Sequence, residues 1–524
     1  MSRVKSKSLF DLIHSLSPNE KRHFKINHTG SGDPEDKKML LLFDYLNKQK
    51  VFNEERVSEV IPSIKSSQLS NLKAYLYEKV MLSLRQYNLP KILDLQIREQ
   101  IDFAQLLFER RLYQQGKSCL KKARRLAQVH ENLELTLEII KLEKSILMLT
   151  IDEDIEETVD TIIDDVRKIN SQIHNINMFS NLSIKLNSYY TRIGFIRDEE
   201  DSIRVKEYFN SNLPDYKEEE LSLGEKTTLY LLYIGYYYFL QDFSNGHLYA
   251  NRLVHLYEEN PDRIKFSPEN YVKALNNLMI SEFKLNYFNE FVESKHKLIN
   301  FTNDSTVYFN ERLKTSLLKY YFIHELNLFF LTGEFHAGVK KLFVDRKEDI
   351  DDLLKKLDPH SALILMYKIS CLYFGAGLYN HCLRWLNKII NIPNVDIRED
   401  IHCFARIINL ICHYELGNFD VIKYYIISTY RFLWKRDDLR MFQKFILKFL
   451  KDLNNDVNVT ELVSRFSTLK NQLEPIENSA YEKRAFIYFD IISWLESKIE
   501  GTTVQETIMS KAKARGFYLD PEEL

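Results

Sequence analysis

A short pattern recurs along the chain: a glycine or polar residue, then an aromatic residue, and a small residue three positions after the aromatic. Apolar residues at helical spacing flank each copy, so we interpret each copy as the tight turn of a helical hairpin. The clearest copies are Leu112-Tyr113 with Gly116, Asp242-Phe243 with Gly246, Gly333-Glu334-Phe335 with Gly338, Gly377-Leu378-Tyr379 with Cys382, and Gly417-Asn418-Phe419 with Ile422. Such a repeat constrains the architecture and indicates little about chemistry.

Glycine and proline are rare, with 14 and 11 copies among 524 residues, whereas together they make up roughly 12% of average proteins. Because these two residues interrupt regular structure, we expect most of the chain to be helical. The chain is too long for one core, since cores stop growing near roughly 250–300 residues. Stacked repeats escape that limit because each repeat packs only on its neighbours. The sequence therefore predicts an all-α fold built from repeats.

The turn aromatics give the register of the repeats. From Phe243 onward they are spaced by about 40–47 residues, and the longer gap after Tyr113 has room for three units. We expect the turns in that gap near Ile151 and Asp198, which gives about eight hairpins over residues 91–435. The marks are Tyr113, Phe243, Phe288, Phe335, Tyr379 and Phe419.

Two of these units resemble a tetratricopeptide repeat: Tyr373, Gly377, Tyr379, Cys382, Leu386, Ile389 and Pro393 in one, and Ala104, Leu107, Tyr113, Gly116, Leu120 and Ala123 in the other. The resemblance implies a right-handed α-solenoid of irregular hairpins. The chain departs from the family where the period exceeds the usual 34 residues and where Phe291 and Ile422 replace the small residue. A solenoid of another family with longer helices remains an alternative.

The two ends of the chain lack the turn mark. Residues 1–90 predict a helical N-terminal head, with Ser17 capping a helix that begins at Pro18 and Glu20 completing a capping box. Further head helices are expected at about 36–49, 53–60 and 68–87. Residues 436–524 predict a degenerate hairpin and a C-terminal cap, with helices at Leu439–Leu453, Ala480–Ile499 and about 504–515. As a whole the chain resembles uncharacterised bacterial proteins that pair such a head with tetratricopeptide-like repeats, and that resemblance implies no particular activity.

Charge and cysteine usage favour a cytoplasmic protein. The formal net charge is −2, with a mildly basic head, which is below what a dedicated nucleic-acid binder requires. No secretory signal is visible, and the longest nearly apolar run, Leu229 to Leu240, is too short to cross a bilayer. The five cysteines form no CxxC pair, so we expect reduced thiols.

Sites for cofactors, metals and catalysis are not predicted. Gly116-Lys117-Ser118 lacks the upstream glycine and the strand of a phosphate loop. Zinc sites usually need two closely spaced ligand pairs, and this chain offers only scattered candidates, so we favour buried thiols and histidines. Those candidates are Cys371, His381, Cys382, His402, Cys403, Cys412 and His413. We therefore expect a non-enzymatic protein without a cofactor.

Nucleic-acid binding is an alternative that we do not favour. Helices at 53–60 and 68–87 have the order of a helix-turn-helix, with polar residues near the start of the second helix, but the linker with Pro62 is long. Those polar residues are Lys65, Gln68, Asn71, Lys73 and Tyr75. Basic runs at Lys117–Arg125 and at Arg440, Lys444 and Lys448 are interpreted as solvated helix faces.

The best candidate for function is the concave face, which the first helix of each hairpin lines in tetratricopeptide-like stacks. Asparagine amides and lysines among aromatic side chains are typical of a groove that binds a peptide backbone and its carboxylates. The candidate partner-binding residues are Lys273, Asn276, Asn277, Lys284, Tyr320, Asn327, Phe330, Tyr367, Phe374, Phe404 and Tyr414. Alternatively, these aromatic side chains pack against one another and close the groove.

The sequence thus favours a scaffold that binds a protein or peptide along the concave face. The alternative is a transcription or signalling regulator whose head contacts DNA or a response partner while the repeats sense a peptide. The partner and the oligomeric state do not follow from the sequence.

Overall fold

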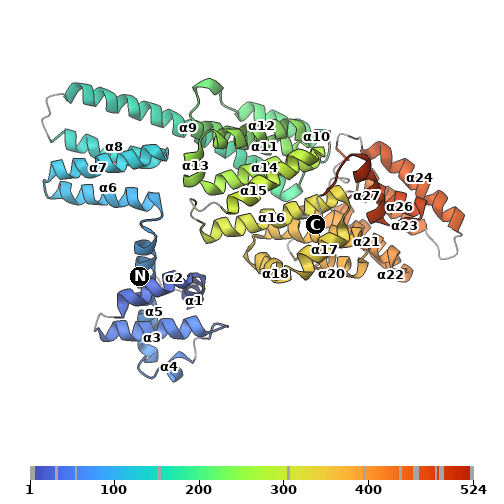
Figure 1. Cartoon of the computed structure of the whole chain (residues 1–524), viewed down its shortest axis with the longest axis horizontal. Coiled ribbons are helices and arrows are strands. Elements are labelled where there is room, and N and C mark those ends of the chain that lie inside the picture. Colours follow the sequence, from blue (N-terminus) through green and yellow to red (C-terminus); the bar gives the residue numbers. More distant parts are fainter. Residues whose placement is uncertain are drawn as a thin grey trace. The chain divides into compact units, whose positions relative to one another are not determined.

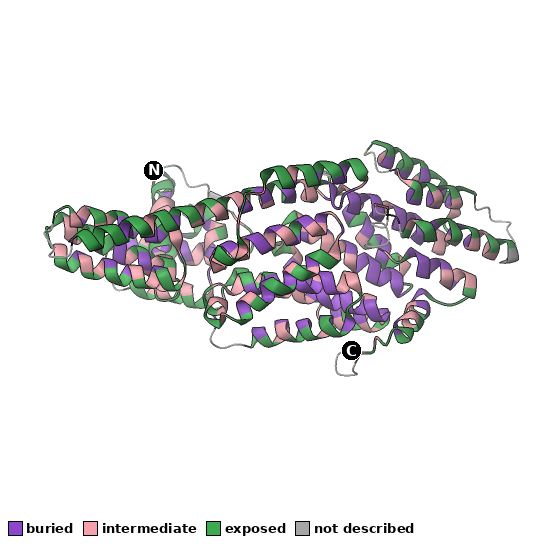
Figure 2. Cartoon of the chain, turned by 90° about the horizontal axis from the view of Figure 1, so that it is seen from above, coloured by how far each residue is buried: buried purple, intermediate pink, exposed green. Residues whose placement is uncertain are grey.

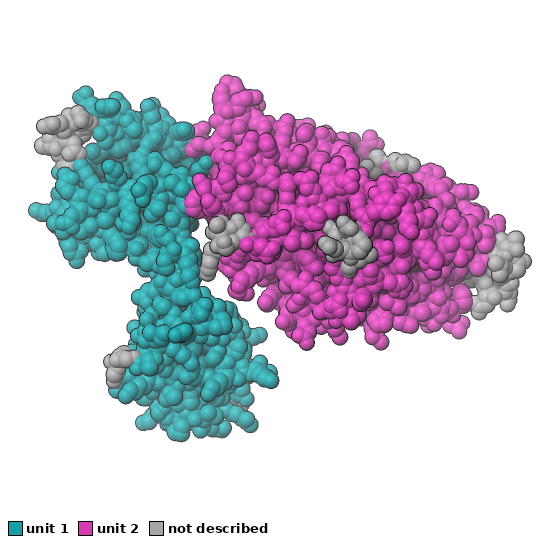
Figure 3. Space-filling view, in the orientation of Figure 1, with its two compact units in different colours: residues 1–169 teal, residues 170–524 magenta. Residues whose placement is uncertain are grey.

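The computed structural model describes residues 6–29, 33–53, 56–149, 155–303, 307, 309–393, 397–435, 439–452, 459–477, 479, 481–482 and 489–519. Within these ranges the regular elements are helices and no strand occurs, which confirms the all-α class (Figure 1). The chain divides into two compact units, Met1–Ile169 and Asn170–Leu524 (Figure 3).

The first unit holds two cores. One lies among the head helices, where the predicted capping box is present: the Glu20 carboxylate accepts a hydrogen bond from the Ser17 N–H at 2.8 Å. The other lies in a three-helix group around Ile97, Ala123 and Ile139. The head helices are α1 (Ser6–Ser15), α2 (Pro18–His28), α3 (Pro34–Lys48), α4 (Val57–Val60) and α5 (Ser66–Asn88), and the three-helix group is α6 (Leu93–Glu109), α7 (Tyr113–Val129) and α8 (Leu133–Leu147).

The second unit contains a succession of hairpins followed by C-terminal helices, with buried residues facing neighbouring helices and exposed residues facing outward (Figure 2). Helix α9 (Ile155–Ile193) crosses the division between the units. The others are α10 (Glu199–Asn212), η1 (Glu218–Glu220), α11 (Leu223–Phe239), α12 (Phe243–Glu258), α13 (Pro261–Phe266), α14 (Pro268–Leu285), α15 (Phe288–Thr302), α16 (Glu311–Thr332), α17 (Phe335–Val339), η2 (Lys340–Val344), α18 (Lys347–Lys356), α19 (Pro359–Gly375), α20 (Tyr379–Ile390), α21 (Glu399–Glu415), α22 (Phe419–Lys435), α23 (Met441–Asp452), α24 (Val459–Glu477), α26 (Ile491–Glu500) and α27 (Val504–Ala514).

Every turn aromatic identified in the sequence is the first residue of a helix. We call the helix before the turn helix A and the helix after it helix B. Two residues before each aromatic, the backbone adopts the left-handed conformation, whether or not the residue is a glycine. The residues are Arg111 (φ 60°), Gln241 (61°), Asn286 (57°), Gly333 (79°), Gly377 (69°) and Gly417 (70°).

The missing glycines therefore do not change the turn. In most copies the N–H of the residue before the aromatic donates to a carbonyl five residues earlier, which closes the end of helix A as in a Schellman motif. Examples are Leu112 N–H to Leu107 O and Leu378 N–H to Tyr373 O, both 2.9 Å. A further copy, at Glu131 (φ 49°) before Leu133, joins α7 to α8 without an aromatic.

The small residue after the turn allows helix B to lie close to helix A, as predicted. A Cβ atom added to Gly246 would lie 2.3 Å from the ring of Tyr238 on helix A, and one added to Gly338 would lie 2.8 Å from the ring of Phe329. The turn aromatic Phe335 reaches the next hairpin, where a Cβ atom on Gly375 would lie 2.6 Å from its ring.

The A helices of successive hairpins contact one another in the second unit. Helix α14 contacts α16, α16 contacts α19, and α19 contacts α21, while α27 packs against α16. The chain is thus repeat-like and all-helical, whereas the right-handed solenoid remains a prediction.

Two sequence predictions differ from the structure. Residues 155–193 form one 39-residue helix instead of further hairpins, because this segment has no glycine or proline before Gly194 (φ 77°). The expected turn near Ile151 lies outside the described residues, and Asp198 caps α10. The helix expected at Ala480–Ile499 is also wrong: α26 begins at Ile491, because the Asp490 side chain caps it by accepting from the Ser493 N–H at 2.9 Å.

The left-handed turn residue gives a direct test. Arg111 is exposed at φ 60°, so we expect Arg111→Gly to stabilise the protein by about 1 kcal/mol, because glycine adopts this conformation without a steric penalty. Its neighbour Arg110 has φ −89°, and Arg110→Gly should destabilise the protein by about 0.5–1 kcal/mol. Chemical denaturation measures both variants, and equal shifts would contradict the assigned turn.

Candidate ligand-binding cavity

The second unit contains a cavity of about 1000 Å³ at the ends of four successive A helices. The C-terminal segment supplies the rest of its lining. Its wall therefore combines hairpin turns with helices that follow far later in the chain. The lining residues that the turns supply include Leu240, Gln241, Asp242, Phe283, Lys284, Asn286, Phe330, Phe335 and Cys371, and those from the C-terminal segment include Glu474, Glu477, Asp490, Glu496, Lys511 and Arg515.

Two partly buried lysines lie together at the cavity. Lys284, near the end of α14, lines it, and Lys368 of α19 lies near enough to lower the pKa of Lys284 electrostatically. Burial is the main cause and Arg398 adds to it, so the pKa of Lys284 lies well below its ordinary value. Burial lowers the pKa of Lys368 to about 8. The site therefore holds cations in a poorly solvated place.

Aromatic rings support these lysines. The Nζ atom of Lys368 lies 5.1 Å from the ring centre of Phe283 and 5.3 Å from that of Phe330, and Lys284 Nζ lies 4.8 Å from Phe283. All three distances fall within the range of cation–π attraction. Phe283 and Phe330 also line the cavity, so they offer an apolar surface beside the charges.

A chain of buried polar groups orients Lys368. Its Nζ donates to Asn327 Oδ1 at 2.6 Å, the Asn327 amide lies 3.3 Å from His324 Nδ1, and His324 Nε2 lies 3.1 Å from Asn276 Oδ1. Burial and then Lys368 lower the pKa of His324 to about 3, so the imidazole is neutral. The amide of Asn327 then donates to Nδ1 and Nε2–H donates to Asn276, which fixes the direction of every bond.

A second pair of lysines consists of Lys273, on the same face of α14 as Lys284, and Lys319 of α16. Lys273 is eleven residues before Lys284, which is about three helical turns or roughly 16 Å along the axis. Burial lowers the pKa of both lysines. At Lys319 of α16 the nearby Asp358 acts in the opposite direction, and Lys273 lowers the pKa further. The A helices α14, α16 and α19 thus present four lysines as two pairs.

Two carboxylates of the C-terminal segment, Glu474 and Glu496, form ion pairs with lysines. Glu496 forms ion pairs with Lys470 at 3.1 Å and with Lys511, and these pairs hold the pKa of Glu496 below its ordinary value although burial acts in the opposite direction. Burial and then Asp490 raise the pKa of Glu477.

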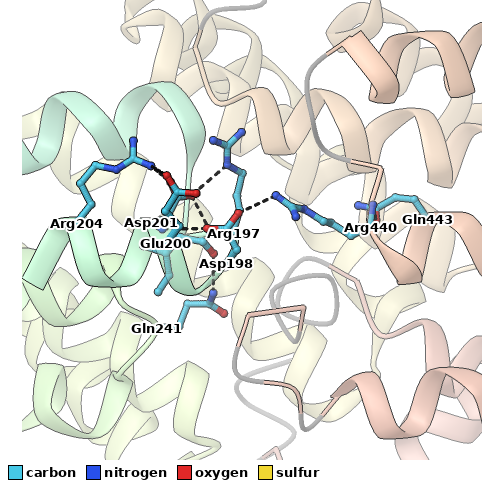
Figure 4. Close-up of polar contacts among 9 residues, drawn as sticks. Arg197, Asp198, Glu200, Asp201, Arg204, Gln241, Arg440 and Gln443 are labelled. Carbon is cyan, nitrogen blue, oxygen red and sulfur yellow. Dashed lines mark hydrogen bonds and ion pairs between the residues drawn. The ribbon is translucent and has the colours of Figure 1, made fainter.

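A network of ion pairs fixes the start of α10, which contributes Ser202 and Lys206 to the cavity (Figure 4). Arg197 Nε donates to Asp201 Oδ2 at 3.2 Å, and Asp198 Oδ1 accepts from the Asp201 N–H at 2.9 Å. Arg440 Nη2 lies 3.0 Å from Asp198 Oδ2. This last contact joins α10 to the segment before α23.

The structure brings some of the predicted partner-binding residues together and separates others. Lys284 and Phe330 line the cavity, and Asn276 and Asn327 belong to the polar chain behind it. The Tyr367, Phe374 and Phe404 side chains are buried, Tyr320, Asn277 and Tyr414 are half-buried, and Lys273 is exposed. Whether these residues bind a partner remains a prediction.

Sequence reasoning missed Lys368 and His324. Lys368 is the only charged residue among lysine, arginine, aspartate and glutamate in the otherwise apolar segment 359–375. A single charged residue in such a segment could have indicated a functional role. His324 had no comparable signal, because its role depends on asparagines from two different helices.

The remaining candidates from the sequence are the metal ligands and the basic helix face. No group of three or more histidine, cysteine or acidic residues is placed to hold a metal within the described ranges, and Cys382 and Cys412 lie 3.5 Å apart in the packing between α20 and α21. Lys444 and Lys448 are exposed opposite buried Phe442, as expected of a solvated face.

In the head, Lys65, Gln68 and Asn71 are exposed at the start of α5, whereas the Tyr75 hydroxyl donates to Asp36 at 3.0 Å. DNA binding by the head remains an alternative that the sequence does not favour. None of the helices in the described ranges has both the length and the apolar character needed to cross a membrane.

Comparison with known proteins finds no family model that matches the chain, and no curated protein matches it either.

The neutral His324 predicts a dependence of stability on pH. Its folded pKa of about 3 lies below the ordinary 6.5, so unfolding takes up a proton when the pH falls below 6.5. The stability from the neutral imidazole is complete above pH 6.5 and is lost as the pH falls toward 3. At pH 5 the loss amounts to about 2 kcal/mol. Denaturation at pH 7 and pH 5 should show that His324→Gln removes this loss, whereas His255→Gln, at an exposed histidine, keeps it.

Proposed function

We propose that the protein is a non-enzymatic, cytoplasmic scaffold that binds a peptide or a protein segment in the cavity of its second unit. The observation that supports this most is that helix A residues chosen from the sequence, Lys284 and Phe330 with Asn327 behind them, gather at one cavity of about 1000 Å³. Two successive hairpins supply these residues, so the site depends on the repeat architecture.

The cavity has the chemical variety that a peptide requires. Its lining includes aromatic rings, lysines, carboxylates and the amide of Asn286, whereas sites for small apolar ligands are lined mainly by hydrophobic side chains. Its volume lies at the upper end of the range for single ligands, roughly 300–1,000 Å³. A segment of several residues with both polar and apolar side chains fits such a lining.

Filling the cavity tests the proposal. Ser244 lines it and is exposed, so Ser244→Trp places an indole in the space without disturbing a core. We expect this variant to bind a synthetic library of random heptapeptides about tenfold more weakly or worse than the wild type, by fluorescence anisotropy. Ser211→Trp, at an exposed serine at the end of α10 outside the lining, is the control and should bind as the wild type does. Equal binding by all three proteins would place the peptide site elsewhere.

A further inference from the structure

The lysines of the A helices are arranged in a way that suits one class of ligand. Lys284 and Lys368 form one pair at the cavity. Lys273 and Lys319 form the other, and Lys273 lies on the same face of α14 as Lys284. Lys273 is exposed and the other three are half-buried, so all four remain reachable. Lys284 and Lys368 concentrate positive charge where burial disfavours it, and a bound anion would relieve that cost.

We propose that this face of the second unit binds an extended acidic peptide, with one carboxylate at Lys284 and Lys368 and a second carboxylate at Lys273 and Lys319. This inference rests on the peptide-binding function proposed above and assigns the chemical class of its ligand.

The distance between the pairs sets the spacing of the two acidic residues. Along α14 the pairs are separated by roughly 16 Å. An extended chain rises about 3.3 Å per residue and its successive side chains point to opposite faces, so two acidic side chains on one face should be four residues apart, about 13 Å, with the long glutamate and lysine side chains spanning the rest. Asn277 lies between the lysines on α14 and is half-buried, which places an amide where a peptide backbone would pass.

The inner pair is built to hold a carboxylate. Lys368 is fixed by Asn327 at 2.6 Å, and that asparagine is fixed by His324 and Asn276, so the ammonium group pays little further ordering cost on binding. The rings of Phe283 and Phe330 flank it and exclude water, which strengthens an ion pair with the ligand.

A nucleic acid is the main competitor for a lysine-bearing face, and the cavity argues against it. Glu477 and Asp490, which lie near each other, line the same cavity, and a continuous run of phosphates would be repelled there. A peptide can place acidic residues at the lysine pairs and neutral or basic residues near these carboxylates.

The test uses the full chain and three heptapeptide libraries with otherwise random positions. One library has glutamate at positions 1 and 5, the second has glutamine at both, and the third has glutamate at positions 1 and 3. We expect the first library to bind about tenfold more tightly than the other two, because only its members place a carboxylate at both lysine pairs. Lys284→Met, Lys368→Met, Lys273→Met and Lys319→Met should each remove most of that preference.

Lys347→Met is the matched control, since it removes one charge from an exposed lysine on α18 and should keep the preference. Circular dichroism establishes that each variant remains helical, and a double variant, Lys273→Met with Lys319→Met, tests the outer pair without touching the inner one.

Each outcome is decisive. If the glutamate and glutamine libraries bind equally and Ser244→Trp still weakens both, the cavity binds peptides and the acidic assignment is wrong. If no library binds, the proposed function fails and the inference fails with it. If a single-stranded oligonucleotide binds more tightly than the first library and loses binding in the same lysine variants, the ligand class is wrong.

Discussion

The left-handed residue at the end of each helix A determines where the next helix begins, and most of the architecture follows from it. With the backbone reversed at this residue, the next helix starts two positions later and returns along its partner. Glycine, asparagine, glutamine, glutamate and arginine all occupy the position, so the conformation is maintained by the closing hydrogen bond as well as by residue type. The cavity lies at the ends of four A helices, which places it beside these same turns.

The lysines at the cavity are costly for the fold. An ammonium group loses hydration on burial. This loss lowers the pKa values of Lys284 and Lys368 and so favours the neutral amine. Asn327 and two aromatic rings offset part of it for Lys368. A hydrophobic side chain would avoid the cost altogether, and perturbed groups of this kind concentrate at functional sites. The proposed binding of a ligand would account for lysines that do not contribute to stability.

The sequence predicted the local elements of the repeats well and their longer connections less well. Each turn aromatic begins a helix because the left-handed residue that ends the previous helix lies only two positions before it. The turn therefore depends on local chemistry alone. The turn before Leu133 was missed because neither a glycine nor an aromatic marks it, and α9 was misjudged because a spacing argument assumed turns where no breaking residue occurs. Lys284 and Phe330 were predicted from register, whereas the chain from His324 to Asn276 joins residues 48 positions apart.

The net charge of the chain does not predict the sign of the charge at the cavity. The chain carries 72 basic and 74 acidic side chains, and the balance is spread over long helices. Folding separates the signs: Glu496 is paired with Lys470 and Lys511 within the C-terminal segment, while Lys284 and Lys368 lie together with rings and amides around them. The electrostatic field at the cavity therefore depends on where folding places the charges as well as on their total. A nearly neutral protein can in this way present a cationic surface whose spacing, rather than its total charge, selects the ligand.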